Sequence, residues 1–177
     1  MDINLFLITF LMILLTTSSL SKFFSLKSFN TTLNKIGFSK KLAGILSYFV
    51  PLAEITIVVL MVSPNTQQVA FLSVILLSLA FTSITVYTMK FRKVNINCNC
   101  FGSLTEERLG PRTFLHIILL VIPTVIILFN GENNKGILNF SKLEIGYTAT
   151  IEIGLIMIYL LVISIRNYLK AIKRINL

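Results

Sequence analysis

The fold is decided by residues 42–62, which read LAGILSYFVPLAEITIVVLMV. Glu54 is the one charged side chain in this stretch, and apolar residues precede and follow it. At about 1.5 Å per residue, a helix of this length covers the roughly 30 Å hydrocarbon core of a bilayer. The stretch therefore predicts a transmembrane helix.

Four further apolar stretches have similar lengths and lie at residues 3–20, 67–89, 113–129 and 145–165. Hydrophobic residues make up 55% of the 177 residues and charged residues 13%, a composition that a soluble domain of this size cannot bury. No strand-like alternation is present, and an open sheet edge is not stable in lipid. We expect an all-α, polytopic membrane bundle of about five transmembrane helices, a four-helix core plus one, forming a single domain over residues 1–177.

The loop between the first two spans carries a helical pattern of its own. Apolar side chains recur at Leu26, Phe29, Leu33 and Ile36, with lysines between them and Gly37 after the last. This pattern predicts a short amphipathic helix over residues 26–37 that lies in the headgroup plane. The alternative is a disordered basic linker.

The distribution of Lys and Arg predicts sidedness. The formal net charge is +9, and the basic residues lie beside apolar spans, which favours anionic lipid over nucleic acid as their partner. From the N-terminus to the tail the six non-spanning segments hold 0, 5, 0, 5, 2 and 4 basic residues, with Lys22 assigned to the first loop. The alternation predicts an outside N-terminus and a cytoplasmic location for the loop before residue 113 and for the C-terminus.

Charged and polar side chains inside the spans require an explanation, because placing them in lipid is energetically costly. Glu54 shares a helix face with Pro51 and small residues, so we expect it to point into the bundle. Glu152 lies at a similar depth when residues are counted from the span ends, so the two carboxyls are candidates to share a proton. Each is otherwise a protonated, hydrogen-bonded packing residue.

The two cysteines of the chain occupy one polar window, Cys98-Asn99-Cys100-Phe101-Gly102. Five Lys and Arg residues flank the window, and a positive field favours the reactive thiolate. A disulfide between residues so close together needs a bent loop, which Gly102 helps to form. Three interpretations stay open: an exchanging redox pair, half of a soft-metal site completed by His116 or a second subunit, and inert cysteines.

Arg112 and His116 lie one turn apart at the start of the fourth predicted span, directly after the cysteine window. His116 is the single histidine of the chain. It is either a proton carrier for the thiols or a histidine satisfied by a neighbouring carbonyl or hydroxyl.

The Cys-x-Cys-Phe-Gly element between the third and fourth spans resembles the methylamine-utilisation MauE family, within the wider DoxX-like group of redox-associated membrane proteins. Lys22 after the first span, Pro51 with Glu54, and Arg112 match further family positions, and the resemblance covers roughly residues 1–130. The chain departs from the family at Asn99, where a small residue is common, and at Thr113, where asparagine is frequent.

The resemblance implies a role in disulfide formation or thiol transfer that supports maturation of a partner protein, in the namesake system a periplasmic amine dehydrogenase subunit. A periplasmic substrate conflicts with the cytoplasmic cysteine loop that the charge count predicts.

We expect a membrane thiol–disulfide component, a thiol–disulfide oxidoreductase if it is an enzyme, in which Cys98 and Cys100 exchange electrons. Arg112 would stabilise a thiolate and Glu54 would be a buried proton site or a packing residue. The expected partners are membrane lipid and a thioredoxin-like or other redox protein; no cofactor, metal or nucleic acid is assigned. The alternative is a non-enzymatic accessory or immunity protein that acts by helix packing.

Overall fold

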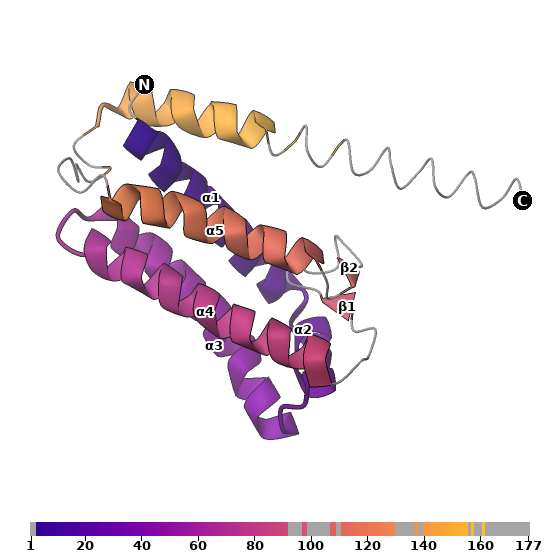
Figure 1. Cartoon of the computed structure of the whole chain (residues 1–177). Helices are drawn as coiled ribbons and strands as arrows, with labels where there is room; N and C mark the ends of the chain where they lie inside the picture. Colours follow the sequence, from indigo (N-terminus) through magenta and orange to yellow (C-terminus); the bar gives the residue numbers. More distant parts are fainter. Residues whose placement is uncertain are drawn as a thin grey trace, which may run out of the picture.

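The computed structural model describes residues 3–91, 97–98, 107–108, 111–129, 137, 140–155, 157 and 161. Its helices are α1 (Ile3–Phe24), α2 (Leu26–Ile36), α3 (Lys40–Val62), α4 (Gln67–Phe91) and α5 (Pro111–Phe129), and residues 142–155 are also helical. Two short strands, β1 (Asn97–Cys98) and β2 (Glu107–Arg108), lie between α4 and α5 (Figure 1).

Among the described residues, three helices are long and apolar enough to cross a membrane: α1, α3 and the Gln67–Thr88 part of α4. α5 contributes a shorter apolar segment, Ile117–Phe129. Only 28% of the most apolar window of α3 is buried inside the protein, so most of its hydrophobic surface faces outward, as lipid contact requires. The prediction of a helical, polytopic integral membrane protein is confirmed.

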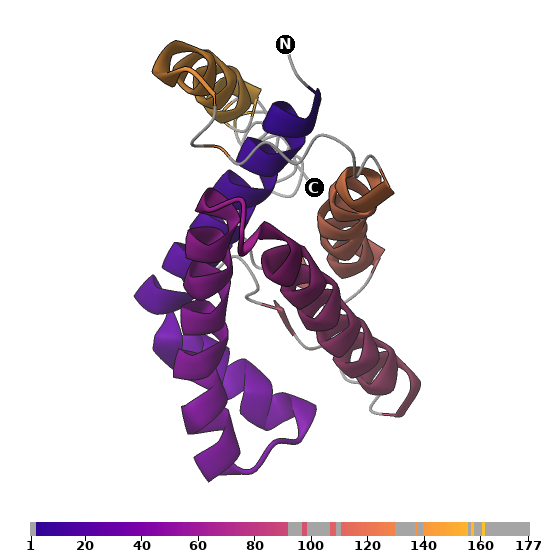
Figure 2. The same ribbon diagram turned by 90° about the vertical axis from the view of Figure 1, so that its left-hand side faces the viewer.

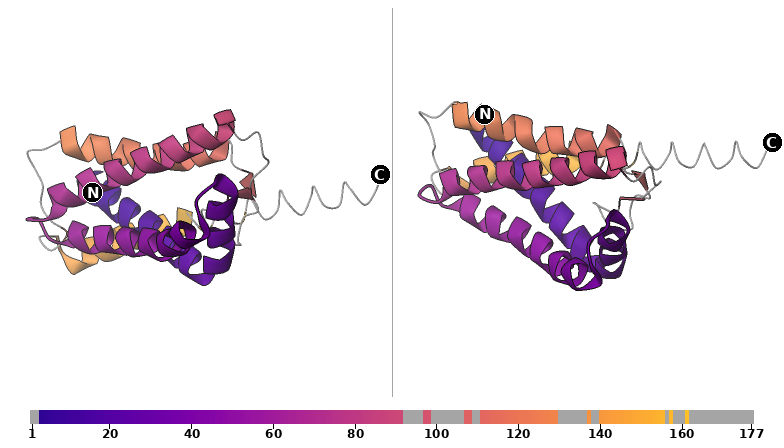
Figure 3. Two further views of the ribbon diagram at one scale, coloured as in Figure 1. Left: turned by 90° about the horizontal axis from the view of Figure 1, so that it is seen from below. Right: turned by 60° about the horizontal axis from the view of Figure 1, so that its bottom comes forward.

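The helices form a bundle that α1 crosses obliquely. α1 packs against α3 and α5, and α4 packs against the same two helices (Figures 1 and 3). Between them lies a core of aliphatic and aromatic side chains: Leu5, Ile8, Leu11, Leu15, Ile57, Met61, Phe71, Val74 and Ile127. α3 and α4 diverge from the turn that joins them (Figure 2).

One end of the bundle gathers α2, the strand pair, the C-terminal ends of α1 and α4, and the N-terminal ends of α3 and α5 (Figure 1). α2 packs against α3 through Phe29, Leu33 and Ala43 and leaves Lys27 exposed. It ends at Gly37, whose φ of 119° is left-handed and whose N–H donates to the carbonyls of Leu33 and Asn34. The first loop thus forms a helix rather than a disordered linker.

The loop between α4 and α5 contains a short strand pair that the sequence pattern did not indicate. There β1 and β2 pair antiparallel, with Cys98 opposite Glu107 and Asn97 opposite Arg108. A two-residue ladder is too short to produce a readable alternation. It also lies between helices rather than within one, so the lipid argument against open sheet edges does not apply to it.

Candidate functional site

The most highly organised polar site in the described part of the chain is centred on Lys22, in the last turn of α1. Its ammonium group forms an ion pair with Glu54 of α3 and donates to Ser18 Oγ at 3.0 Å. Ser18 in turn donates to Glu54 Oε1 at 3.3 Å. Lys22 and Glu54 are each 2% exposed, so two opposite charges are held together away from solvent, as a low-dielectric interior requires.

Lys22 also contacts two aromatic rings. Its Nζ lies 5.2 Å from the ring centroid of Phe81 on α4 and 6.0 Å from that of Phe29 on α2. Both distances fall within the range at which a cation is attracted to an aromatic face. One ammonium group therefore links α1, α2, α3 and α4.

Lys22 was predicted to lie in the loop after the first span, whereas in the structure it lies within α1. α1 continues to Phe24, one turn past the predicted end at residue 20, and Lys22 points inward from that extra turn. The partner that makes this burial tolerable, Glu54, lies 32 residues away in the sequence. The local signal for an inward face was the run of small polar residues, Ser18 and Ser19, that precedes the lysine.

Small residues allow α1 and α3 to approach closely at this site. Ser19 Oγ donates to the carbonyl of Pro51 at 2.8 Å, and Ser19 is fully buried. Pro51 and Ser47 are also buried on the same face of α3 as Glu54. The face that the sequence identified on α3 is thus covered by α1 of the same chain.

The second oxygen of the Glu54 carboxylate has a different environment. Glu54 Oε2 is buried without a hydrogen-bond partner among the described residues. A buried carboxylate oxygen with a free lone pair is able to accept a proton or the hydrogen of a water molecule. Glu54 therefore forms an ion pair through Oε1, and its Oε2 remains able to accept a hydrogen bond.

Glu152 belongs to a separate site, contrary to the expectation that it lies level with Glu54. It accepts a hydrogen bond from Thr9 Oγ1 at 2.7 Å. Thr9 is nine residues before Ser18 on α1, which corresponds to about 14 Å along the helix axis. The fully buried Leu11 and Leu15 lie between them. Counting residues from span ends did not place the two carboxyls correctly, because they contact α1 at positions nine residues apart.

Cys98 lies at the same end of the bundle as α2. Cys98 is in β1, and β1 contacts α2, the helix that supplies Phe29 to the lysine site. Cys100 and Gly102 lie outside the described residues. The structure therefore fixes the backbone of one cysteine of the pair and its neighbour across the ladder, Glu107.

Arg112 and His116 fall within the first two turns of α5, and of these two residues only the backbone is described. Their helix begins at the end of the bundle that holds β1 and β2 (Figure 1). The structure thus brings Lys22, Pro51 and Glu54 into one site and places β1 and the start of α5 at the same end.

No group of three or more His, Cys, Asp or Glu residues that could hold a metal ion occurs among the residues with described positions.

Comparison with family models shows the family of this chain. The family model described as "Methylamine utilisation protein MauE" matches residues 2–129, which include α1 to α5. No curated protein and no solved structure matches. The matched range covers more than half of the 177 residues, and it confirms the resemblance drawn from the cysteine, lysine and proline–glutamate positions. The chain is an integral membrane protein that belongs to the methylamine utilisation protein MauE family.

Proposed function

We propose that the protein is a membrane thiol–disulfide component in which Cys98 and Cys100 exchange electrons with a redox partner, in support of the maturation of a protein used in methylamine metabolism. The observation that carries the proposal is the position of Cys98, in a strand braced against α2 at one end of a membrane bundle. A soluble partner reaches a bundle end, whereas it cannot reach thiols within the hydrocarbon core. Membership in the MauE family supports the link to methylamine utilisation.

The partner's own thiols supply the two electrons of the exchange. A thiolate of the partner attacks one sulfur of a Cys98–Cys100 disulfide and forms a mixed disulfide; the second partner thiol then attacks it and leaves Cys98 and Cys100 as thiols. Two electrons move from the partner to this chain, and the partner leaves oxidised. The reverse sequence reduces the partner.

Residues near the window have supporting roles in this proposal. Arg112, at the start of the helix after the window, favours the thiolate by its charge, and His116 carries the proton that a thiol releases. Lys22 and Glu54 hold α1, α2, α3 and α4 together and so fix the surface against which β1 rests.

The alternative of a protein that acts by helix packing receives less support from the structure. Its supporting features were two small-residue stripes, one on α4 (Ser73, Ala80, Ser83 and Tyr87), which is largely exposed, and one on α3. The stripe on α3 is occupied by Ser18 and Ser19 of α1 within the same chain, so it is not available to a partner helix.

The test is redox titration of the full chain in its native membrane. We expect maleimide labelling of the two cysteines to fall together as the glutathione buffer becomes more oxidising, in a single reversible two-electron transition. Either Cys98→Ser or Cys100→Ser should abolish the transition, and the loop control Asn99→Ser should retain it. Labelling that does not depend on the buffer would contradict the proposal and favour inert cysteines.

A further inference from the structure

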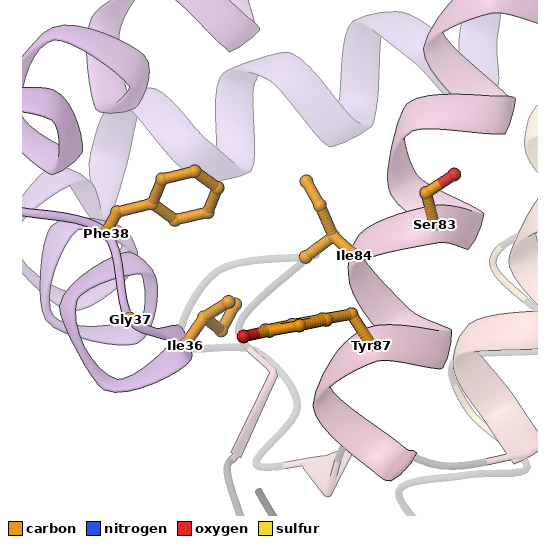
Figure 4. Close-up of a pocket in the computed structure, with 6 residues that line it drawn as sticks. All are labelled: Ile36, Gly37, Phe38, Ser83, Ile84 and Tyr87. Carbon is orange, nitrogen blue, oxygen red and sulfur yellow. The ribbon is translucent and has the colours of Figure 1, made fainter. Parts of the chain in front are cut away.

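A cavity of about 380 Å³ lies between the end of α2 and α4. Its lining comes from two short segments: Ile36, Gly37 and Phe38 on one side, and Ser83, Ile84 and Tyr87 on the other. Phe38 faces Ile84 across the space, and the Tyr87 ring reaches toward Ile36 (Figure 4). The volume falls in the range of about 300–1,000 Å³ that small-molecule sites occupy.

The cavity lies beside the ends of two candidate membrane spans. The candidate membrane span of α4 ends at Thr88, one residue after Tyr87, and that of α3 begins at Lys40, two residues after Phe38. Both walls therefore reach the level at which a helix leaves the hydrocarbon. A ligand held here has one part in the apolar layer and another among the headgroups.

The charged residues that follow the two lining segments in sequence are positive. Lys40 and Lys41 form the first turn of α3 and are exposed, and Lys90, also exposed, follows Tyr87 by three residues on the same face of α4. No Asp or Glu occurs from residue 3 to residue 53 or anywhere in α4. Cations in the first turn of a helix are disfavoured by the helix dipole, and a bound anion removes that penalty.

We propose that this cavity is a binding site for an anionic phospholipid. The phosphate lies at Lys40 and Lys41, where it also meets the positive end of the α3 dipole, and the upper part of one acyl chain lies between Phe38 and Ile84. A neutral lipid lacks the attraction to Lys40 and Lys41, and free phosphate lacks the apolar part. The proposal does not depend on the thiol chemistry.

Native mass spectrometry of the delipidated full chain tests the site, by titration with phosphatidylglycerol and with phosphatidylcholine of the same acyl chains. We expect clear preference for phosphatidylglycerol. The double variant K40Q/K41Q should lose roughly 10- to 30-fold in affinity for it, as the removal of two lysine charges near an anionic headgroup implies. The matched control K27Q/K142Q removes two exposed lysines elsewhere and should keep the preference.

The cavity itself is tested by filling it. Ile84→Trp places bulk in the lined space and should reduce phosphatidylglycerol binding, whereas Val86→Trp, on an exposed face of α4, should not. Helix content by circular dichroism confirms that each variant is folded. Equal binding of the two lipids, unchanged binding by Ile84→Trp, or equal competition by inorganic phosphate would each overturn the proposal.

Discussion

At the residue scale, the effect of replacing Glu54 on the free energy of unfolding depends on its ion pair with Lys22, which the sequence around either residue does not indicate. A protonated Glu54 without a cationic partner would tolerate replacement by glutamine. In the ion pair the same replacement leaves the Lys22 ammonium buried without its counter-charge. Breaking a buried pair from one side costs about 3–5 kcal/mol, whereas replacing both partners by apolar side chains is often close to neutral.

We therefore predict that Glu54→Gln destabilises the protein strongly and that K22M/E54L is more stable than Lys22→Met or Glu54→Leu alone. Thermal unfolding of the detergent-purified single and double variants gives the coupling free energy between the two sites. Additive effects in this cycle would show that the two charges do not stabilise one another.

The hydrogen bond from Thr9 to Glu152 yields a second residue-scale prediction. Thr9→Val removes the hydroxyl and keeps the shape, so the loss should be close to the average for hydrogen bonds between membrane helices, about 0.6 kcal/mol and at most about 1.7 kcal/mol. Thr17→Val is the matched control, because the Thr17 hydroxyl is exposed and bonds only to carbonyls of its own helix. If the two variants unfold at the same temperature, the Thr9 contact contributes nothing to stability.

At the element scale, the end of α2 depends on the backbone conformation of Gly37. A residue with a Cβ atom is strained at a φ of 119°, which lies outside the region that L-residues adopt readily. The glycine ends α2 and turns the chain directly into the first residues of α3, and it forms part of the cavity wall.

Gly37→Ala should accordingly destabilise the protein by about 1–2 kcal/mol, the cost of a left-handed conformation for an L-residue. Gly146→Ala is the control: this glycine lies in the helix at 142–155, a Cβ there meets nothing within 4 Å, and alanine is the better helix former. We expect Gly146→Ala to be neutral or stabilising in the same unfolding assay. Equal destabilisation by both changes would argue against a conformational role for Gly37.

At the scale of the whole molecule, the apolar runs predicted the helices well because bilayer thickness imposes a length that the sequence shows directly. Residues 42–62 and 67–89 correspond to α3 and α4 to within two residues at each end. The end of α1 and the separation of Glu152 from Glu54 could not be predicted, because both depend on partners far away in the sequence. The cysteine window was recognisable from composition, but the position of Cys98 opposite Glu107 in a strand pair was not.

The burial of Lys22 also changes the count that predicts sidedness. Without Lys22 the first loop keeps four basic residues, Lys27, Lys35, Lys40 and Lys41, and the alternation becomes 0, 4, 0, 5, 2 and 4. The order of high and low values is unchanged, so a cytoplasmic cysteine loop is still expected. The structure adds a constraint: α2 and β1 lie at one end of the bundle and the α3–α4 turn, with the exposed Asn65, lies at the other (Figure 1).

The prediction is that reduced Cys98 and Cys100 react in intact cells with a membrane-permeant maleimide but not with a bulky impermeant one. In a cysteine-free background, Asn65→Cys should be labelled by the impermeant reagent and Thr31→Cys on α2 should be protected until lysis. Because Asn65 and Thr31 lie at opposite ends of the bundle, the two cysteines should be accessible from opposite sides of the membrane, and each serves as a control for the other. Impermeant labelling of Thr31→Cys and protection of Asn65→Cys would reverse the orientation and place the thiols outside, where disulfides of an exported partner form.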